Sequence, residues 1–247
     1  MLLTERRIYL NVPEQSAQAA QALGATWDMD ARGWWIASHV PKVPYLQWLP
    51  RMHRPDRSPP HLVSQLVPGP LWGVNLRLLL PRSRWDALRR AVYAQAGKRC
   101  QVCGGIGPQW PVECNEQWAY EGDGSSRGVQ KLLRLTALCP DCHAVKHLGK
   151  ANVEGRLEAA VLHLALVNGW GVDEARRHAE AAFETWLKRS RMSWTVDLTI
   201  LREWGIDRLD LDEAMRATLP EIEGVSIAWK KRQVHMSNCG LVDLSTS

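Results

Sequence analysis

Two pairs of cysteines constrain this chain more than any other feature of its sequence. Cys100-Gln-Val-Cys103 and Cys139-Pro-Asp-Cys142 each hold two thiols at CxxC spacing. Such a turn lets both sulfurs reach one tetrahedral Zn²⁺ at about 2.3 Å, and four thiolates leave no coordination position for water or substrate. We therefore predict a structural zinc ion that joins two distant segments and contributes on the order of 10 kcal/mol to folding. Iron–sulfur ligation and a redox dithiol are alternatives, but they explain two matched pairs less economically.

The bulk properties of the chain favour a nucleic-acid partner and a reducing compartment. The 247 residues carry a net charge of +5 with a pI of about 9.0, and a basic chain is attracted to polyanions by counterion release. No run approaches the roughly 18 apolar residues of a membrane span, and no apolar region of a secretory signal follows the charged start. We expect a cytoplasmic protein that does not enter membranes, with nucleic acid favoured as partner over the alternative of a merely basic soluble enzyme, and with Cys239 an unpaired thiol.

The first part of the chain, residues 1–52, is predicted to be a small α+β domain. Arg6–Val12 alternates like a strand, Glu14–Leu23 is an Ala-rich helix, and Trp27–Ile36 has the composition of a hairpin. The strings Tyr-Leu-Asn-Val-Pro, Leu-Gly-Ala-Thr-Trp-Asp and Gly-Trp-Trp-Ile resemble a small family of unknown function. That family occurs as an accessory unit beside primases, topoisomerases and other DNA-processing modules, so the resemblance implies a DNA-related context.

The remaining sequence divides into three further regions, and the whole chain is predicted to have an α+β fold. Residues 53–70 are rich in proline and basic residues and are expected to be a linker. Residues 71–151 hold the cysteines and are predicted to form a zinc-stapled ββα module. Residues 152–247 are predicted to form a helical hairpin and a mixed α/β tail.

Within these regions the sequence predicts individual elements. A helix is expected from Arg82, with Ser83 as its N-cap and Gly97 at its end. Strands are expected at 110–120 and 128–137, joined as a hairpin, followed by a helix through His147. The C-terminal region is predicted to contain helices at 154–167 and 173–186, the second capped by Asp173, then a strand at 194–201, a helix at 211–219 and a strand at 224–234.

The order strand, strand, helix ends in Leu-Cys-Pro-Asp-Cys-His-Ala-Val-Lys-His, whose last residue is His147. Over residues 97–150 this resembles the HNH endonuclease family in its four-cysteine zinc version. The resemblance implies that hairpin and helix hold one catalytic cation, Mg²⁺, Mn²⁺, Ni²⁺ or Zn²⁺, and that a histidine on the first strand activates water. The cysteines would then be scaffolding only.

Two signature positions depart from that family. The expected ligand and general base fall at Cys114-Asn115, and the middle asparagine of the pattern falls at Arg134. An amide cannot accept a proton from water near neutral pH, so Asn115 puts hydrolysis in doubt. His143 and His147 keep the four-residue spacing that two imidazoles on one helical face need to share a metal.

Other residues near these positions bear on a second metal and on the missing base. Cys114 or Glu113 could complete a second site with the two histidines, and Glu116 could replace the base. A structural imidazole beside the zinc is the alternative for His143, and an ordinary exposed helical histidine is the alternative for His147.

The sequence therefore leaves three functions open. One is a metal-dependent endonuclease, or a form inactivated at Asn115 by nature or by design. A second is a non-enzymatic nucleic-acid-binding or scaffolding module. A third is a protein-interaction role for the C-terminal region. The expected phosphate contacts are Lys98, Arg99, Arg127, Lys131, Arg134, Lys146 and Lys150. The tryptophans considered for a protein interface are Trp170, Trp186, Trp194 and Trp229.

Overall fold

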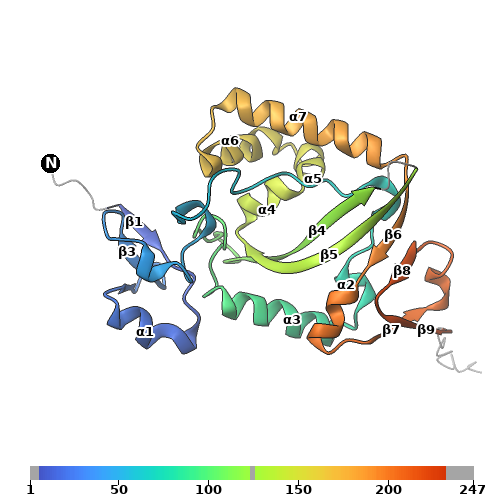
Figure 1. Ribbon diagram of the computed structural model, residues 1–247, viewed down its shortest axis with the longest axis horizontal. Helices are drawn as coiled ribbons and strands as arrows, with labels where there is room; N and C mark the ends of the chain where they lie inside the picture. Colours follow the sequence, from blue (N-terminus) through green and yellow to red (C-terminus); the bar gives the residue numbers. More distant parts are fainter. Residues whose placement is uncertain (1–5, 123–125, 232–247) are drawn as a thin grey trace, which may run out of the picture.

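The protein has an α+β fold in which a long two-stranded ribbon lies between helices (Figure 1). The computed structural model describes residues 6–122 and 126–231. Helix α3 runs below the ribbon and helices α4 to α7 lie above it in the view of Figure 1. A small N-terminal unit lies beside one end of the ribbon, and the last strands lie beside the other end.

The N-terminal unit is a three-stranded antiparallel sheet with one short helix. Its strands are β1 (Arg7–Tyr9), β2 (Thr26–Asp28) and β3 (Gly33–Ala37), in the order β1-β3-β2, and its helix is α1 (Ala17–Ala22). Ile8, Leu10 and Ile36 fill a core that Trp48 and Leu49 close. The predicted strand, helix and hairpin are therefore confirmed, with a shorter first strand and a helix that begins as a 3₁₀ turn at Glu14–Ser16.

The central sheet is built on the predicted hairpin. Strands β4 (Glu113–Gly122) and β5 (Arg127–Leu138) pair antiparallel, with a bulge at Gln117/Trp118. Strands β6 (Ser193–Asp197) and β8 (Glu221–Glu223) extend the sheet in parallel, in the order β4-β5-β6-β8. Strand β4 is thus an edge strand, and the Gln65 side chain donates to the backbone carbonyl of Trp118 on it. Strands β7 (Arg208–Asp212) and β9 (Ser226–Lys230) form a separate parallel pair.

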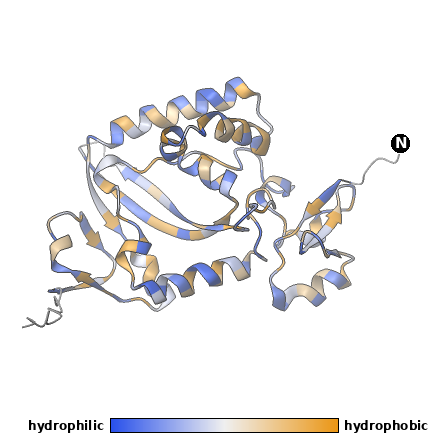
Figure 2. Cartoon of the chain, turned by 180° about the vertical axis from the view of Figure 1, so that it is seen from behind, coloured by the Kyte–Doolittle hydropathy of each residue, from blue (hydrophilic) through white to orange (hydrophobic). Residues whose placement is uncertain are grey.

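The helices occupy both faces of the ribbon. They are α2 (Leu76–Leu79), α3 (Arg82–Gln95), α4 (Pro140–Lys146), α5 (Leu148–Val153), α6 (Leu157–Asn168) and α7 (Val172–Arg189). Helix α6 is mostly hydrophobic (Figure 2) because it is enclosed by α4, α5 and α7 in the largest core. None of the described helices is long and apolar enough to cross a membrane.

Some predicted boundaries and caps are wrong. Pro81, not Ser83, occupies the N-cap of α3, and Gly171, not Asp173, occupies that of α7. Proline is tolerated at a helix start because the first N–H groups of a helix have no partner within the helix, so the missing N–H costs nothing there. Asp173 instead stabilises the first turn of α7 through its negative charge. The helix predicted at 154–167 begins at Leu157, after a separate α5.

The tail also differs from its prediction. Residues 211–219 form the end of β7 and a 3₁₀ turn at Glu213–Met215 rather than a helix. The alternate residues Leu209 and Leu211 of β7 are buried in a second hydrophobic core, which the strand conformation allows. The strand predicted at 194–201 ends at Asp197 and a 3₁₀ segment follows. Of the strand predicted at 224–234, Ser226–Lys230 is formed, and its last residues lie outside the described part of the chain, as does Cys239.

The segment expected to be a linker, 53–70, lies against the helices. Leu62 and Leu66 are buried in the core that α4, α6 and α7 share. The side chain of Asn168 accepts hydrogen bonds from the backbone N–H groups of His61 and Leu62 and donates one to the Leu62 carbonyl at 2.8 Å. The proline-rich segment is therefore held against the helices by these contacts. The division of the chain into domains stays a prediction.

Candidate metal centre and groove

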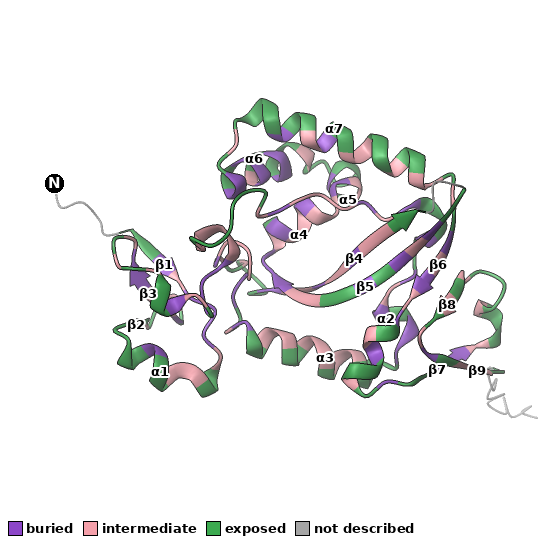
Figure 3. Ribbon diagram, in the orientation of Figure 1, coloured by how far each residue is buried: buried purple, intermediate pink, exposed green. Residues whose placement is uncertain are grey.

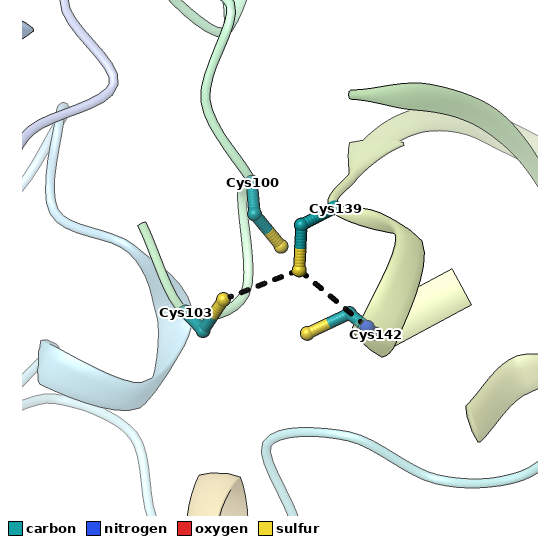
Figure 4. Close-up of side chains that lie close together, drawn as sticks. All are labelled: Cys100, Cys103, Cys139 and Cys142. Atoms are coloured by element: carbon teal, nitrogen blue, oxygen red, sulfur yellow. Dashed lines mark hydrogen bonds between the residues drawn. The ribbon is translucent and has the colours of Figure 1, made fainter. Parts of the chain in front are cut away.

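The four cysteines of the CxxC pairs converge at one end of the ribbon (Figure 4). Their sulfur atoms all lie within 4.8 Å of one another, and the Sγ atoms of Cys103 and Cys139 are 3.6 Å apart. A tetrahedral ion with Zn–S bonds of 2.3 Å separates its sulfurs by about 3.8 Å. The four residues therefore fit a metal ion such as zinc, which the CxxC spacing predicted.

Backbone and side-chain groups around the cluster orient its sulfurs. The N–H of Gly105 donates to Cys103 Sγ at 3.4 Å and the N–H of Cys142 donates to Cys139 Sγ at 3.5 Å. Nε2 of His163 lies 3.1 Å from Cys142 Sγ. His163 belongs to α6 and was not singled out from the sequence, because its contact joins residues that lie 21 positions apart. Such outer partners hold metal ligands in place and tune their affinity.

The N-terminal unit contacts the chain next to the first CxxC turn, residues 100–103. The Asn11 side chain donates to the backbone carbonyls of Ala96, Arg99 and Cys100 at 3.1 to 3.3 Å. Gly97, in the left-handed conformation with φ +58°, lies so close to Val12 that a Cβ would be 2.5 Å from the Val12 carbonyl oxygen. The N-terminal unit and the metal centre therefore pack as closely as a single core.

Arg99 completes this junction and is not available to phosphate. Its guanidinium donates to the carbonyl oxygens of Gly104 at 3.0 Å and Ala31 at 2.6 Å, and its Cζ lies 4.0 Å from the centre of the Tyr9 ring. Only 3% of Arg99 is exposed. The expected phosphate contact at Arg99 is therefore wrong, because the charge is used to dock the N-terminal unit.

Asn115, at the position where the HNH resemblance expects the general base, is buried with 3% of its surface exposed. The Nδ2 of Asn115 donates to Oγ1 of Thr136 across the β4–β5 pair at 3.2 Å. Asn115 does not line the groove described below. An amide in this position holds the two strands together and does not approach solvent.

The two helical histidines lie together, but no closed second site surrounds them. The rings of His143 and His147 meet edge to face with centroids 4.7 Å apart, and Nδ1 of His143 contacts the Glu113 carboxylate. That contact lowers the pKa of Glu113, while burial lowers the pKa of His147 to about 4 and keeps it neutral. Within residues 6–122 and 126–231, the four cysteines are the one group of three or more ligand side chains that converges.

Cys114 does not join these histidines. Cys114 and Ala137 are partners in the β4–β5 pair, and Ala137 packs with Val92 and Tyr93 of α3, on the side of the ribbon away from α4. Burial raises the pKa of the Cys114 thiol to about 12, so it stays protonated at neutral pH. A protonated, partly buried thiol is a poor metal ligand and a poor nucleophile.

A large groove runs along the open edge of β4, with a volume of 1630 Å³. Its walls come from α3, from residues 66–77, from α4 and α5, and from α7. Glu113, Cys114, Glu116, His143 and His147 all line it. One groove thus holds the carboxylates and imidazoles that the sequence singled out.

Glu116 is the most perturbed carboxyl group of this groove. Its Oε1 accepts a hydrogen bond from the N–H of Leu76, at the start of α2, at 2.8 Å. Burial raises the pKa of Glu116 to about 7, and this hydrogen bond only partly opposes the shift. Within the described residues, no ion pair of 4 Å or less involves Glu116. The sequence named Glu116 but could not reveal this environment.

The other expected phosphate contacts are spread along the molecule rather than gathered at the two CxxC turns. Arg127 begins β5 and Cys139 follows its end, which separates them by about 40 Å at 3.3 Å per residue. Lys131 pairs with Asp197 at 3.2 Å, and Lys150 lies 3.8 Å from Glu154. Lys98 is exposed at the end of α3.

Arg134 and Lys146 lie on the α4 side of the ribbon. Nε of Arg134 donates to Gln117 at 2.8 Å. Burial, together with the charges of Arg51 and Arg134, lowers the pKa of Lys146 to about 8. These two cations are near each other, yet Lys146 is mostly enclosed.

The tryptophans considered for a protein interface pack against cores. Trp170 and Trp186 contact the core around α6, while Trp194 and Trp229 belong to or contact the core between the sheets. The structure therefore uses these side chains mainly for packing.

Comparison with known proteins adds a link for the N-terminal unit. Residues 7–50 match the family described as Domain of unknown function (DUF5710). A 42-residue stretch is 40% identical to the DNA primase TraC of Escherichia coli, which is 17% of this chain and 4% of that protein. No solved structure matches the chain. The HNH-like interpretation of residues 97–150 rests on its motif and on the observed ββα order.

Proposed function

We propose that this protein binds DNA, and that a zinc ion held by the four cysteines shapes the ββα element and anchors both neighbouring parts of the chain. The similarity of a 42-residue stretch of this chain to part of a DNA primase supports a DNA-related context. The fit of four sulfurs to one tetrahedral ion supports a structural zinc with no open position.

The observation that carries the proposal is the charge on and around α3. Residues 77–98 hold six basic residues and one acidic residue, a net charge of +5, which equals the net charge of the whole chain. Helix α3 has no buried residue, which Figure 3 shows as pink and green along its length. Helix α3 itself carries four arginines and one aspartate, a net charge of +3, and Arg77 and Lys98 flank it, so this exposed region can release counterions from a polyanion. The exposed basic residues are Arg77, Arg82, Arg84, Arg90 and Lys98.

Binding is favoured over cleavage because the position of the expected base is sequestered. Asn115 is buried against Thr136, and Cys114 faces the opposite side of the ribbon from His143. Asn115 does not line the groove, and Cys114, which does line it, is a protonated thiol that offers neither a proton acceptor nor a thiolate ligand at neutral pH.

The test is a salt titration of DNA affinity with charge-matched variants. Arg84→Gln with Arg90→Gln removes two positive charges from α3. Arg177→Gln with Lys188→Gln removes two from α7, which lies on the other side of the ribbon. The α3 variant should weaken binding and reduce the slope of log K against log[salt] by up to about 1.8 for duplex DNA. Equal slopes for both variants and the wild type would overturn the proposal.

A second candidate function, metal-dependent phosphodiester hydrolysis, is favoured by the groove itself. Glu113, Glu116, His143 and His147 all line it, with Glu116 on the α3 side of β4 beside Cys114, and a carboxyl group with a pKa of about 7 suits general-base catalysis near neutral pH. His143 with Glu113 would hold the cation, in the manner that the HNH resemblance implies.

Cleavage assays decide between the two candidates. Plasmid and single-stranded DNA are incubated with Mg²⁺, Mn²⁺ or Ni²⁺, using the wild type, Asn115→His and His143→Ala. Nicking by the wild type or by Asn115→His that His143→Ala removes would establish an HNH-type nuclease. Absence of nicking in every form excludes hydrolysis and leaves DNA binding untouched.

A further inference from the structure

The groove beside β4 is bordered by aromatic side chains that packing does not require. Trp72 and Trp110 both line it, and 69% and 67% of their surfaces are exposed. An exposed indole is costly to hydrate, and tryptophan is enriched at binding interfaces. These two rings stand out because most other tryptophans of the chain are at least half buried.

Trp72 is held in place although it is exposed. Its Nε1 donates to the carbonyl of Val67 at 2.9 Å, and its ring stacks on that of Trp186, with centroids 6.4 Å apart and an interplanar angle of 25°. Trp186 donates to the same carbonyl at 3.0 Å. The exposed indole is thus fixed in advance, and binding need not freeze it.

The charges around the groove suit a polyanion. Arg77, Arg82 and Lys150 line it, and so does Arg89, whose charge is already paired with Asp86. Its carboxylates are offset by neighbours: Asp86 accepts from Arg89 at 2.7 Å, and Glu113 contacts His143. Glu154 pairs with Arg156, and Glu116 is partly protonated at neutral pH because of its burial.

We propose that this groove binds single-stranded nucleic acid, with unpaired bases stacked on Trp72 and Trp110 and with the phosphate backbone following the arginines of α3. Only unpaired bases offer their faces to an indole, because bases in a duplex already stack on one another. The inference rests on the proposed DNA-binding function and adds the form of DNA that the groove takes.

The test compares the affinities of the full-length protein for labelled (dT)₁₅ and for a 15-base-pair hairpin by fluorescence anisotropy at one salt concentration. Trp72→Leu and Trp110→Leu should each weaken binding of (dT)₁₅ by about 5- to 150-fold and leave duplex affinity within about twofold. Trp72→Phe keeps an aromatic face and should retain most of the affinity. Trp27→Leu is the matched control, since Trp27 is 44% exposed on the N-terminal unit, outside the groove.

Wild-type affinity for (dT)₁₅ in both leucine variants would overturn the inference. If the α3 charge variants still lower the salt slope, the DNA-binding function survives that result. If the wild type shows no salt-dependent binding to either DNA, the proposed function fails first. Sedimentation runs in parallel: self-association that Trp72→Leu abolishes would assign the groove to a second copy of the chain and overturn the inference. A Trp72→Phe variant that loses binding as fully as Trp72→Leu would overturn stacking as its cause.

Discussion

Glu116 should make the stability of this protein fall as the pH rises through neutrality. Its carboxyl group is buried at the edge of β4, and its pKa lies near 7 instead of the usual 4.5. The folded state therefore binds a proton more tightly than the unfolded state. The stabilisation is complete below about pH 4.5 and is lost as the pH rises to about 7 and beyond. The difference between a pKa of about 7 in the folded state and the usual 4.5 corresponds to about 3 kcal/mol.

The variant Glu116→Gln removes this titration and keeps the shape of the side chain. Its amide oxygen can still accept the hydrogen bond from Leu76. Near pH 5 the variant should be about as stable as the wild type, and at pH 8 it should be more stable by up to about 3 kcal/mol. Urea unfolding at intervals from pH 5 to 8.5 measures the difference in the free energy of unfolding between the two proteins. Titrating groups other than Glu116 contribute equally to both proteins and cancel in this difference.

Glu113→Gln is the matched control with the opposite sign. Contact with His143 lowers the pKa of Glu113, so its stabilisation is present above the unfolded value and is lost as the pH falls through the folded one. This variant should be the less stable protein at neutral pH and should approach the wild type at acid pH. Parallel curves for the wild type and Glu116→Gln over the whole range would refute the reasoning about burial at β4.

Three other substitutions test the remaining parts of the account. Arg99→Ala should cost about 4 kcal/mol, since it removes two hydrogen bonds from a charged donor and a contact with Tyr9, and limited proteolysis should then release the N-terminal unit; an unchanged digestion pattern would contradict this. His163→Ala should lower zinc affinity about 10- to 100-fold in competition with a chromogenic chelator, because it deprives Cys142 of its outer partner; unchanged affinity would show that the contact is idle. Leu164→Ala, at a fully buried position of α6, should lower the free energy of unfolding in urea by about 2 to 5 kcal/mol, and a loss below 1 kcal/mol would mean that this core is loosely packed.

Local patterns in the sequence predicted what depends on neighbours along the chain. The CxxC spacing places two sulfurs on one turn whatever surrounds it, and the convergence of Cys100 and Cys103 with Cys139 and Cys142 followed. Alternating runs predicted the β4–β5 hairpin for the same reason. The spacing of His143 and His147 likewise placed their rings side by side.

Properties set by distant segments could not be predicted. The raised pKa of Glu116 depends on α2 and on the groove, which residues 66–77 help to form. Arg99 resembles a surface cation in the sequence, yet docking of residues 7–50 buries it. The proline-rich segment 53–70 resembles a linker, yet Leu62 and Asn168 fix it against the helices. In each case the deciding partner lies more than 30 residues away in the sequence.

The most direct test of the account is the metal content and ligand set of the purified protein. Elemental analysis with X-ray absorption at the zinc edge should find one zinc per chain, bound by four sulfurs at about 2.3 Å. Its removal by a chelator should unfold the region around Cys100 and Cys139, because zinc binding of about 10 kcal/mol rivals the whole stability of a domain. Protein without metal, with the cysteines joined in disulfides, or zinc bound mainly through nitrogen and oxygen would contradict the account.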